Sequence, residues 1–390
     1  MMDNSIENEV KIFVKKVEGK GYNYVRQFPD GKEEFLCDEY FLKAYPFVNG
    51  IARVNRKNGM WNYVNESGKI ISSSDFTWAN EFRKNGVAMV GFSFGINNLI
   101  NKDGKLLFDN IFEFLEVDPT DEKIYRGFLH GGSFCLLKSD GTIPVNEKFS
   151  LLDFFGANGV ARVLRKNKLY NYIKKDGRFL LDTDYKSASI FRFGFAVVKN
   201  YDDLFNIINS SGKFISDEWF LDAEIFSKGK IFWVKRQNGF YNLLDENGDL
   251  YFDEDFLELK EFSNYKIIFL KRKNGHWNCI KTGGKLLLEN DFALFRGLDN
   301  NGTTAIMFDD GTWNYLNCDG KLLLNENLLE ASNFEYLGII GVAKVVKEAG
   351  KVSYLRSDGV FISEKEYFEL VKKDMKVKIS KSRNSYKNLV

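Results

Sequence analysis

The chain has 390 residues, of which 55 are Lys or Arg and 54 are Asp or Glu, and its net charge is +1 at pH 7. A balance this close to neutral argues against a dedicated nucleic-acid binder, because such proteins carry an excess of basic residues. The four cysteines include no Cys-x-x-Cys pair and there are only two histidines, so we expect no metal site and no cofactor.

Glycine recurs at a nearly fixed interval along the chain. The interval lies between 35 and 39 residues over ten positions, which are Gly31, Gly68, Gly104, Gly141, Gly177, Gly212, Gly248, Gly284, Gly320 and Gly359. A period of this length is typical of proteins that stack one small unit many times. We therefore expect a single array of about ten repeats over residues 18–363.

The residues before the first repeat, 1–17, are expected to form an N-terminal capping strand, since Val10–Val14 resembles the strand that would complete the first repeat. The first nine residues lack the basic segment and apolar run of a secretory signal. No uninterrupted run of about 18 apolar residues occurs either. These observations predict a cytoplasmic protein without a membrane-spanning helix.

Each repeat reads as three short strands separated by tight turns. In one repeat the apolar runs Ile51–Val54, Trp61–Val64 and Lys69–Ile71 are separated by Lys57–Gly59 and Asn65–Gly68. Short β-rich runs with Gly-containing turns between them predict an antiparallel meander. Only Asp75–Phe82 has a pattern that would suit a turn or one short helix.

Three columns of residues define the second strand of the repeat. The first column is mostly aromatic: Tyr22, Trp61, Asn97, Phe134, Tyr170, Phe205, Tyr241, Trp277, Trp313 and Val352. A column two residues on holds Tyr, Leu, Ile or Cys, and the column after that is always aliphatic, which predicts a strand buried on both faces. A Phe further along each repeat, as at Phe82 and Phe155, is expected to fill the space between repeats.

A small polar residue, usually Asn, lies between the aromatic columns. Its positions are Asn23, Asn62, Asn98, Cys135, Asn171, Asn206, Asn242, Asn278, Asn314 and Ser353. A polar group on a buried strand needs hydrogen-bond partners. We expect these side chains to bond backbone groups of a turn or a neighbouring repeat; the alternative is that Asn supports a left-handed backbone.

Two segments depart from the pattern. The stretch from Glu116 to His130 is expected to be a loop insertion. Residues 364–390 carry seven Lys or Arg against one Asp from Lys372 onward and are expected to form a basic C-terminal cap or tail.

Charged residues recur in the turns. Basic residues precede the aromatic column and acidic residues follow the Gly-Lys strand, so repeats stacked in register would carry a basic row and an acidic row on different edges. We predict that the basic row binds an acidic protein surface or a phosphate-bearing ligand, with the candidate binding residues Arg53, Arg56, Arg162, Arg165, Arg236 and Arg272. The alternative is that the charges only keep strand edges soluble and unpaired.

The repeat resembles the bacterial WG-containing repeat family. Trp61–Lys69 and Phe155–Val163 carry the resemblance best, and it extends from Gly21 to about Ser363. The chain departs from the family by placing Asn where the family name has Gly. The resemblance implies a β-rich repeat scaffold without catalytic residues to assign.

The sequence therefore predicts an all-β chain of about ten tandem antiparallel meanders in an open, curved solenoid. A closed β-propeller is the alternative, although propellers have 4 to 8 blades. Because His130 and His276 fit no catalytic triad spacing, we expect no enzyme. We predict a non-catalytic scaffold that binds another macromolecule, expected to be a protein rather than a nucleic acid or a membrane. The alternative is a binder of a small anionic ligand or glycan in grooves between repeats.

Overall fold

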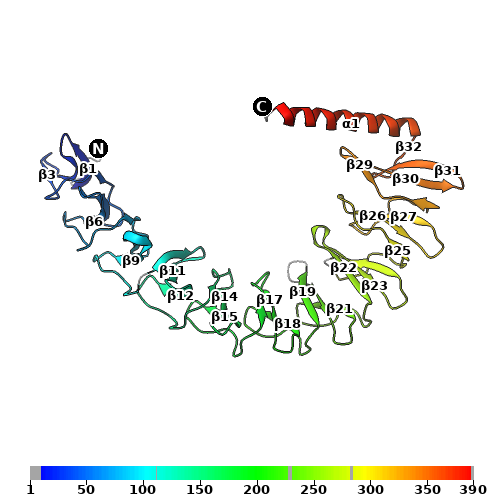
Figure 1. Cartoon of the computed structure of the whole chain (residues 1–390), viewed down its shortest axis with the longest axis horizontal. Helices are drawn as coiled ribbons and strands as arrows, with labels where there is room; N and C mark the ends of the chain where they lie inside the picture. The colour runs from blue at the N-terminus through cyan, green and yellow to red at the C-terminus, as the bar shows by residue number, and fades with distance from the viewer. Residues whose placement is uncertain (1–9, 111, 227–230, 282–283, 388–390) are drawn as a thin grey trace, which may run out of the picture. The chain divides into compact units, whose positions relative to one another are not determined.

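The computed structural model describes residues 10–110, 112–226, 231–281 and 284–387. The chain divides into two compact units, the first comprising Met1–Phe191 with Ser210–Gly212 and the second comprising Arg192–Asn209 with Lys213–Val390. Figure 1 labels the elements of both along the chain.

The described part of the first unit is built from strands and one short 3-10 helix, η1 (Ser93–Gly95). The strands are β1 (Lys11–Val17), β2 (Gly21–Gln27), β3 (Glu33–Phe35), β4 (Lys43–Ala44), β5 (Ile51–Asn55), β6 (Trp61–Asn65), β7 (Trp78–Ala79), β8 (Val87–Gly91), β9 (Asn97–Asn101), β10 (Phe112–Asp118), β11 (Asp121–Leu129), β12 (Ser133–Lys138), β13 (Leu151–Leu152), β14 (Val160–Leu164), β15 (Tyr170–Lys174) and β16 (Ser187–Ala188). They form antiparallel sheets in the orders β1-β2-β3, β4-β5-β6, β7 to β12 and β13-β14-β15.

The second unit continues the same pattern and ends in a helix. Its elements are β17 (Phe195–Lys199), β18 (Phe205–Asn209), β19 (Asp222–Phe226), β20 (Ile231–Lys235), β21 (Tyr241–Asp245), β22 (Glu258–Phe262), the 3-10 helix η3 (Ser263–Tyr265), β23 (Ile267–Lys271), β24 (Trp277–Ile280), β25 (Leu294–Phe295), β26 (Thr303–Met307), β27 (Trp313–Asn317), β28 (Glu330–Ala331), β29 (Glu335–Leu337), β30 (Ile340–Glu348), β31 (Lys351–Arg356), β32 (Phe361–Ile362) and α1 (Glu364–Lys387). Three-stranded sheets β19-β20-β21, β22-β23-β24 and β25-β26-β27 precede a larger last sheet.

The predicted antiparallel meander is confirmed, with small sheets and no closed barrel in the described residues. The third strand expected at Lys69–Ile71 is wrong: this segment makes only an isolated bridge from Ile70 to Val64, and β4 completes the sheet of β5 and β6. The last strand of each repeat is buried on both faces: in β6, Asn62, Tyr63 and Val64 are all buried. Of the turn or short helix expected at Asp75–Phe82, the helix is wrong, because Trp78 and Ala79 form strand β7. Their backbone groups pair with β8, which leaves no helical hydrogen bonds to form.

A column that the sequence analysis missed joins each repeat to the next. Trp61 on β6 and Phe76 exchange two backbone hydrogen bonds, of 2.7 and 2.8 Å. The equivalent buried residues, each bridged to the first-column residue of its repeat, are Phe41, Phe76, Phe112, Phe149, Tyr185, Phe220, Phe256, Phe292 and Leu328. The bridge fixes the chain as it leaves one repeat and enters the following one.

The periodic glycines let consecutive repeats approach closely. A Cβ atom at Gly68 would overlap the backbone carbonyl of Leu36, and one at Gly248 would overlap that of Ile215. Gly31 belongs to the first repeat and has nothing within 4 Å of the same position. Glycine therefore recurs for two reasons: the turn needs a left-handed backbone, and at positions such as Gly68 and Gly248 the preceding repeat leaves no room for a side chain.

The expected loop insertion at Glu116–His130 is wrong. β10 and β11 form a long hairpin. It joins β7, β8 and β9 to β12 in one six-stranded sheet of the order β7-β8-β9-β10-β11-β12. The turn is closed by Asp118, whose Oδ1 accepts the backbone N–H of Thr120 at 2.9 Å. The segment departs from the repeat pattern and contains Asp118–Asp121, but these residues form only the turn of the hairpin.

The segment expected to be a basic tail begins as a capped helix. Ser363 Oγ accepts the backbone N–H of Glu366 at 3.2 Å, and Glu366 Oε2 accepts the backbone N–H of Ser363 at 2.8 Å. This reciprocal capping box starts α1. Tyr367 stacks on Tyr354 of β31 with ring centroids 4.2 Å apart, so the helix rests on the last repeat. No helix in the described part of the chain combines the length and apolar character needed to cross a membrane.

We expect Gly248→Ala to destabilise the protein more than Gly239→Ala. Both glycines have left-handed φ angles, of 92° and 86°, so each substitution carries the same backbone strain of about 1 to 2 kcal/mol. Only Gly248 faces the preceding repeat, since Gly239 has nothing within 4 Å, and the overlap adds about 1 to 3 kcal/mol. Urea unfolding of the two variants measures the difference; equal losses would show that the glycine serves only its turn.

Candidate functional site

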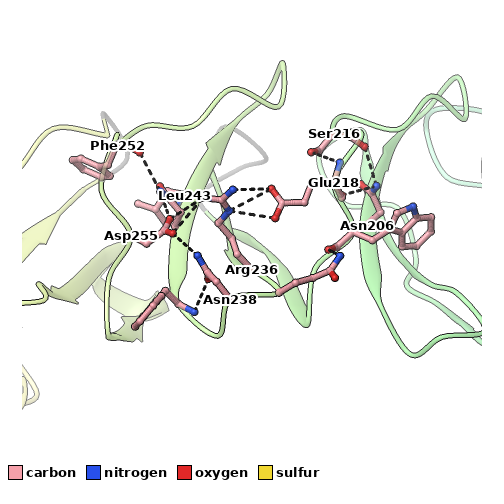
Figure 2. A network of polar contacts seen from close by, with 12 residues as sticks. Asn206, Ser216, Glu218, Arg236, Asn238, Leu243, Phe252 and Asp255 are labelled. Carbon is pink, nitrogen blue, oxygen red and sulfur yellow. Dashed lines mark hydrogen bonds and ion pairs between the residues drawn. The ribbon is translucent and has the colours of Figure 1, made fainter.

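The buried Asn of each repeat ties the last strand of its sheet to the turn that follows about ten residues later in the chain. Nδ2 of Asn242 donates to the carbonyls of Phe252 and Glu254, both at 3.1 Å, and Oδ1 accepts the N–H of Leu243 at 2.8 Å. Figure 2 shows this turn and the equivalent bonds of Asn206 to the segment of Ser216 and Glu218. The carbonyl ten residues on is bonded in the same way by Asn62, Asn98, Asn171, Asn206, Asn278 and Asn314.

The first of the two interpretations of the Asn column is therefore confirmed. None of these Asn residues has a positive φ, which removes the left-handed alternative. Each side chain satisfies carbonyls of its own repeat, so the amide is a structural clamp on the turn.

An arginine in the preceding turn joins the same cluster. Arg236 Nη1 contacts Asp255 at 3.2 Å and Arg236 Nη2 contacts Glu218 at 3.2 Å (Figure 2). Asp255 also accepts hydrogen bonds from Asn238 at 2.8 Å and Asn242 at 2.9 Å. We call this cluster the Arg–Asp–Asn network.

The network recurs in four repeats. Its Arg, Glu and Asp members are Arg56 with Glu39 and Asp75, Arg165 with Glu147 and Asp184, Arg236 with Glu218 and Asp255, and Arg272 with Glu254 and Asp291. The basic and acidic turns therefore meet in ion pairs. The expectation that they lie on different edges is wrong, because the acidic turn of one repeat folds onto the basic turn.

Two repeats have neither the Arg nor the Asp of the network. In the repeat of Trp313 the Arg position is Phe308 and the Asp position is Asn327, which accepts a hydrogen bond from Asn314 at 3.0 Å. In the repeat of Phe205 the two positions hold Asn200 and Trp219. This joint presence and absence indicates that the pair acts as one structural unit.

The other two predicted arginines lie on the central strand of their repeats. Arg53 Nη1 donates to the carbonyl of Ala79 at 2.7 Å, and its guanidinium lies 4.3 Å from the ring centroid of Tyr45. Arg162 donates to the carbonyl of Ala188 at 2.9 Å and pairs with Asp153 at 2.8 Å. All six predicted arginines thus have contacts inside the chain, and their role in binding a partner stays a prediction.

Sequence reasoning missed Arg126, which does on β11 what Arg53 and Arg162 do. Its Nη1 donates to the carbonyl of Leu152 at 2.9 Å, and its guanidinium lies 3.6 Å from the ring centroid of Phe154. In all three cases the arginine bonds a carbonyl 26 residues further along the chain. The sequence alone does not show that residues at this spacing meet.

A basic side chain lies over the first-column aromatic ring in most repeats. The pairs are Lys16 with Tyr22, Arg53 with Trp61, Arg126 with Phe134, Arg162 with Tyr170, Lys199 with Phe205, Lys235 with Tyr241, Lys271 with Trp277 and Arg296 with Trp313, at 4.6 to 6.0 Å. We call them the cation–aromatic pairs. These distances allow a cation–π attraction.

Three of the four cysteines, Cys37, Cys135 and Cys279, are buried. Burial raises the pKa of Cys37 and Cys135 to about 11 and that of Cys279 to about 12, which keeps these thiols protonated at neutral pH. Within the described ranges no three His, Cys, Asp or Glu residues gather as a metal site would require.

The Asp of the network should make stability depend on pH. Burial favours a higher pKa for the Asp255 carboxyl, but hydrogen bonds from Asn242, Asn238 and Arg236 outweigh it and lower the pKa below its usual 3.8. The stabilisation is therefore complete above the unfolded-state pKa and is lost as pH falls through the folded-state pKa.

We expect Asp255→Asn to lower the unfolding free energy by about 1 to 2 kcal/mol near pH 7 and to match the unmodified chain at about pH 2. Asn327 at the same position shows that the amide fits. The control is Asp253→Asn, at an exposed carboxylate of the same turn. Urea unfolding across this pH range is the measurement; a loss that persists unchanged at low pH would contradict the role of the ionised carboxylate.

Comparison with known proteins gives one family match. No curated protein sequence matches the chain significantly. Similar solved structures include the C-terminal WD40 domain of Sif2 (12% identity, TM-score 0.23, covering 68% of this chain and 90% of that one), Hsv2p of Kluyveromyces lactis (12%, 0.27, 64% and 95%) and BamB from Moraxella catarrhalis (10%, 0.24, 72% and 98%). TM-scores this low do not establish a shared fold. The model of the WG-containing repeat matches residues 63–91, which confirms the resemblance and places a repeat of that family in this chain.

Proposed function

We propose that the chain is a non-catalytic repeat scaffold that binds a protein partner through its cation–aromatic pairs. The observation that carries the proposal is their recurrence: the same Arg or Lys over Tyr, Trp or Phe arrangement is offered by successive repeats. Arg, Tyr and Trp are the residue types enriched at the energetic centres of protein interfaces.

Several of the pairs are accessible enough to make contacts, although the rings of Trp277 and Trp313 are buried. The side chains of Arg53 and Arg162 are 19% and 24% exposed, and Trp61, Tyr170 and Tyr241 are half-buried. A half-buried ring whose orientation is already fixed loses little conformational entropy when a partner covers it. The arrangement therefore supports binding by preformed anchors repeated at a regular spacing.

The networked arginines contribute differently to the proposal. Arg165, Arg236 and Arg272 hold turns in place, so reversing their charge would remove ion pairs inside the chain as well as any contact with a partner. The lysines of the cation–aromatic pairs are the better test, because they are not part of the Arg–Asp–Asn network. Lys199, Lys235 and Lys271 are half-buried.

We expect a triple variant Lys199→Glu, Lys235→Glu and Lys271→Glu to lose the protein that the unmodified chain captures in affinity purification with mass spectrometry. These lysines lie over Phe205, Tyr241 and Trp277. The control carries the same charge change at Lys213, Lys285 and Lys321, exposed residues that follow the repeat glycine. Both variants should melt at similar temperatures; equal capture by the two would contradict the proposal.

A binder of a small anionic ligand or glycan is the second candidate. Aromatic rings such as Trp61 and Tyr170 could stack on a sugar, and the cations above them could meet a negative group. A thermal shift produced by a glycan or nucleotide would favour this candidate, since a ligand that binds only the folded chain raises its melting temperature.

We also propose that the repeats continue as an open, curved solenoid. The joint formed by Trp61 and Phe76 recurs with the same two backbone bonds at Tyr170 with Tyr185 and at Tyr241 with Phe256. The regular joint lets the array continue from repeat to repeat. About ten repeats are more than the 4 to 8 blades of one propeller ring.

Small-angle scattering should give a radius of gyration clearly above about 21 Å, the value for a compact particle of this length. An open array extends with each repeat, whereas a closed ring or a pair of rings stays compact. A measured value near that of a compact particle would overturn the solenoid and favour the propeller.

A further inference from the structure

Two repeats carry an ion pair between a carboxylate and an arginine of the neighbouring strand: Asp153 pairs with Arg162 at 2.8 Å, and Glu116 pairs with Arg126 across β10 and β11. A third repeat has the carboxylate without the arginine. On β19 the carboxylate is retained as Glu224, but the residue opposite it on β20 is Trp233. Glu224 therefore has an aromatic ring where its counterparts have a cation.

A cavity lies at this place within the second unit. It has a volume of about 580 Å³ and is lined by Phe193, Glu224, Trp233 and Glu261, with Arg192 and Lys266 among its other lining residues. Trp233 Nε1 donates to Glu261 Oε2 at 2.8 Å, which holds the indole in place between two carboxylates. The backbone of Phe193 is left-handed and its side chain is 63% exposed, so a second ring stands at the cavity wall.

The charges of the cavity favour a cation beside Glu224. Burial and the negative charge of Glu261 raise the pKa of the Glu224 carboxyl, and the opposing effect of Arg192 is smaller. Glu224 makes no ion pair in the described residues, whereas Glu261 also accepts a hydrogen bond from Ser263. A cation placed against Glu224 would offset both the burial and the repulsion.

We propose that this cavity receives a guanidinium or ammonium side chain, Arg or Lys, from a partner protein. The cation would lie against the Glu224 carboxylate and the face of Trp233, much as the Arg162 guanidinium lies against the Asp153 carboxylate. Arg192 and Lys266 line the same cavity, so it also accommodates an acidic residue next to the cation in the partner. The inference rests on the proposed function, because it takes the partner to be a protein.

The test follows the indole N–H signal of Trp233 by NMR, assigned with the variant Trp233→Phe. The probe is the blocked tripeptide Gly-Arg-Gly, and its matched control is the same peptide with citrulline, which keeps the shape and removes the charge. We expect the arginine peptide to shift the signal in a saturable way, with binding at least about tenfold weaker for the citrulline peptide. Equal shifts from both peptides, or none from either, would overturn the proposal.

Two variants locate the effect. Trp233→Arg would pair with Glu224 as Arg162 pairs with Asp153. We therefore expect this variant to fold. We expect it to abolish the arginine-dependent changes in the other signals of the cavity, and Glu224→Gln to weaken binding about tenfold. Glu258→Gln, on a half-buried carboxylate of β22 that pairs with Lys260 outside the cavity, is the control and should bind as the unmodified chain does. Unchanged binding by Trp233→Arg would contradict the assignment.

The same variant separates this inference from the proposed function. If Trp233→Arg still captures the protein partner of the unmodified chain, the scaffold function holds and the cavity has no part in it. If neither chain captures a protein while the arginine peptide still binds, the cavity takes a cation and the proposed scaffold function is wrong.

Discussion

The structure depends on one hydrogen-bonding requirement, which is that a buried amide must be satisfied. The Asn between the aromatic columns lies on a strand that is covered on both faces, so its side chain has no access to water. It bonds the carbonyls of the next turn and thereby fixes where the chain leaves the repeat. Leaving such groups unpaired costs about 1 to 3 kcal/mol each, which is enough to select one conformation of the turn. The Phe76-type bridge and the ion pair of the Arg–Asp–Asn network involve the residues that directly follow that turn, as Phe256 and Asp255 do.

Much of the fold could be predicted because it depends on the spacing of residues that are close together in the sequence. The period of the glycines, the alternation in Trp61–Val64 and the polar residue at Asn62 indicate strands, turns and a buried amide without knowledge of the fold. The bridge at Phe76 was missed because a single bridging residue in an irregular segment has no alternation around it. The hairpin of β10 and β11 was missed because the segment departs from the repeat pattern and contains the turn residues between Asp118 and Asp121.

The candidate site was harder to predict, since it depends on residues far apart in sequence. Arg236 was recognised as basic, but its partners Glu218 and Asp255 lie 18 and 19 residues away on either side. A charge count cannot distinguish a solvated arginine from one that clamps two turns. Trp233 was unremarkable in sequence, because an aromatic residue suits a strand. Its meaning appears only when the pairing with Glu224 is compared with that of Arg162 and Asp153.

The joint between Trp61 and Phe76 has a consequence for how such a chain changes in length. Because the two reciprocal backbone bonds recur at later joints with nearly the same geometry, duplicating or deleting one whole copy would create no new kind of boundary. The number of copies can therefore drift through gene rearrangement while each copy keeps its own chemistry. A feature present once, such as the tryptophan opposite Glu224, would then keep its immediate neighbours. Only the number of repeats between it and each end of the chain would change.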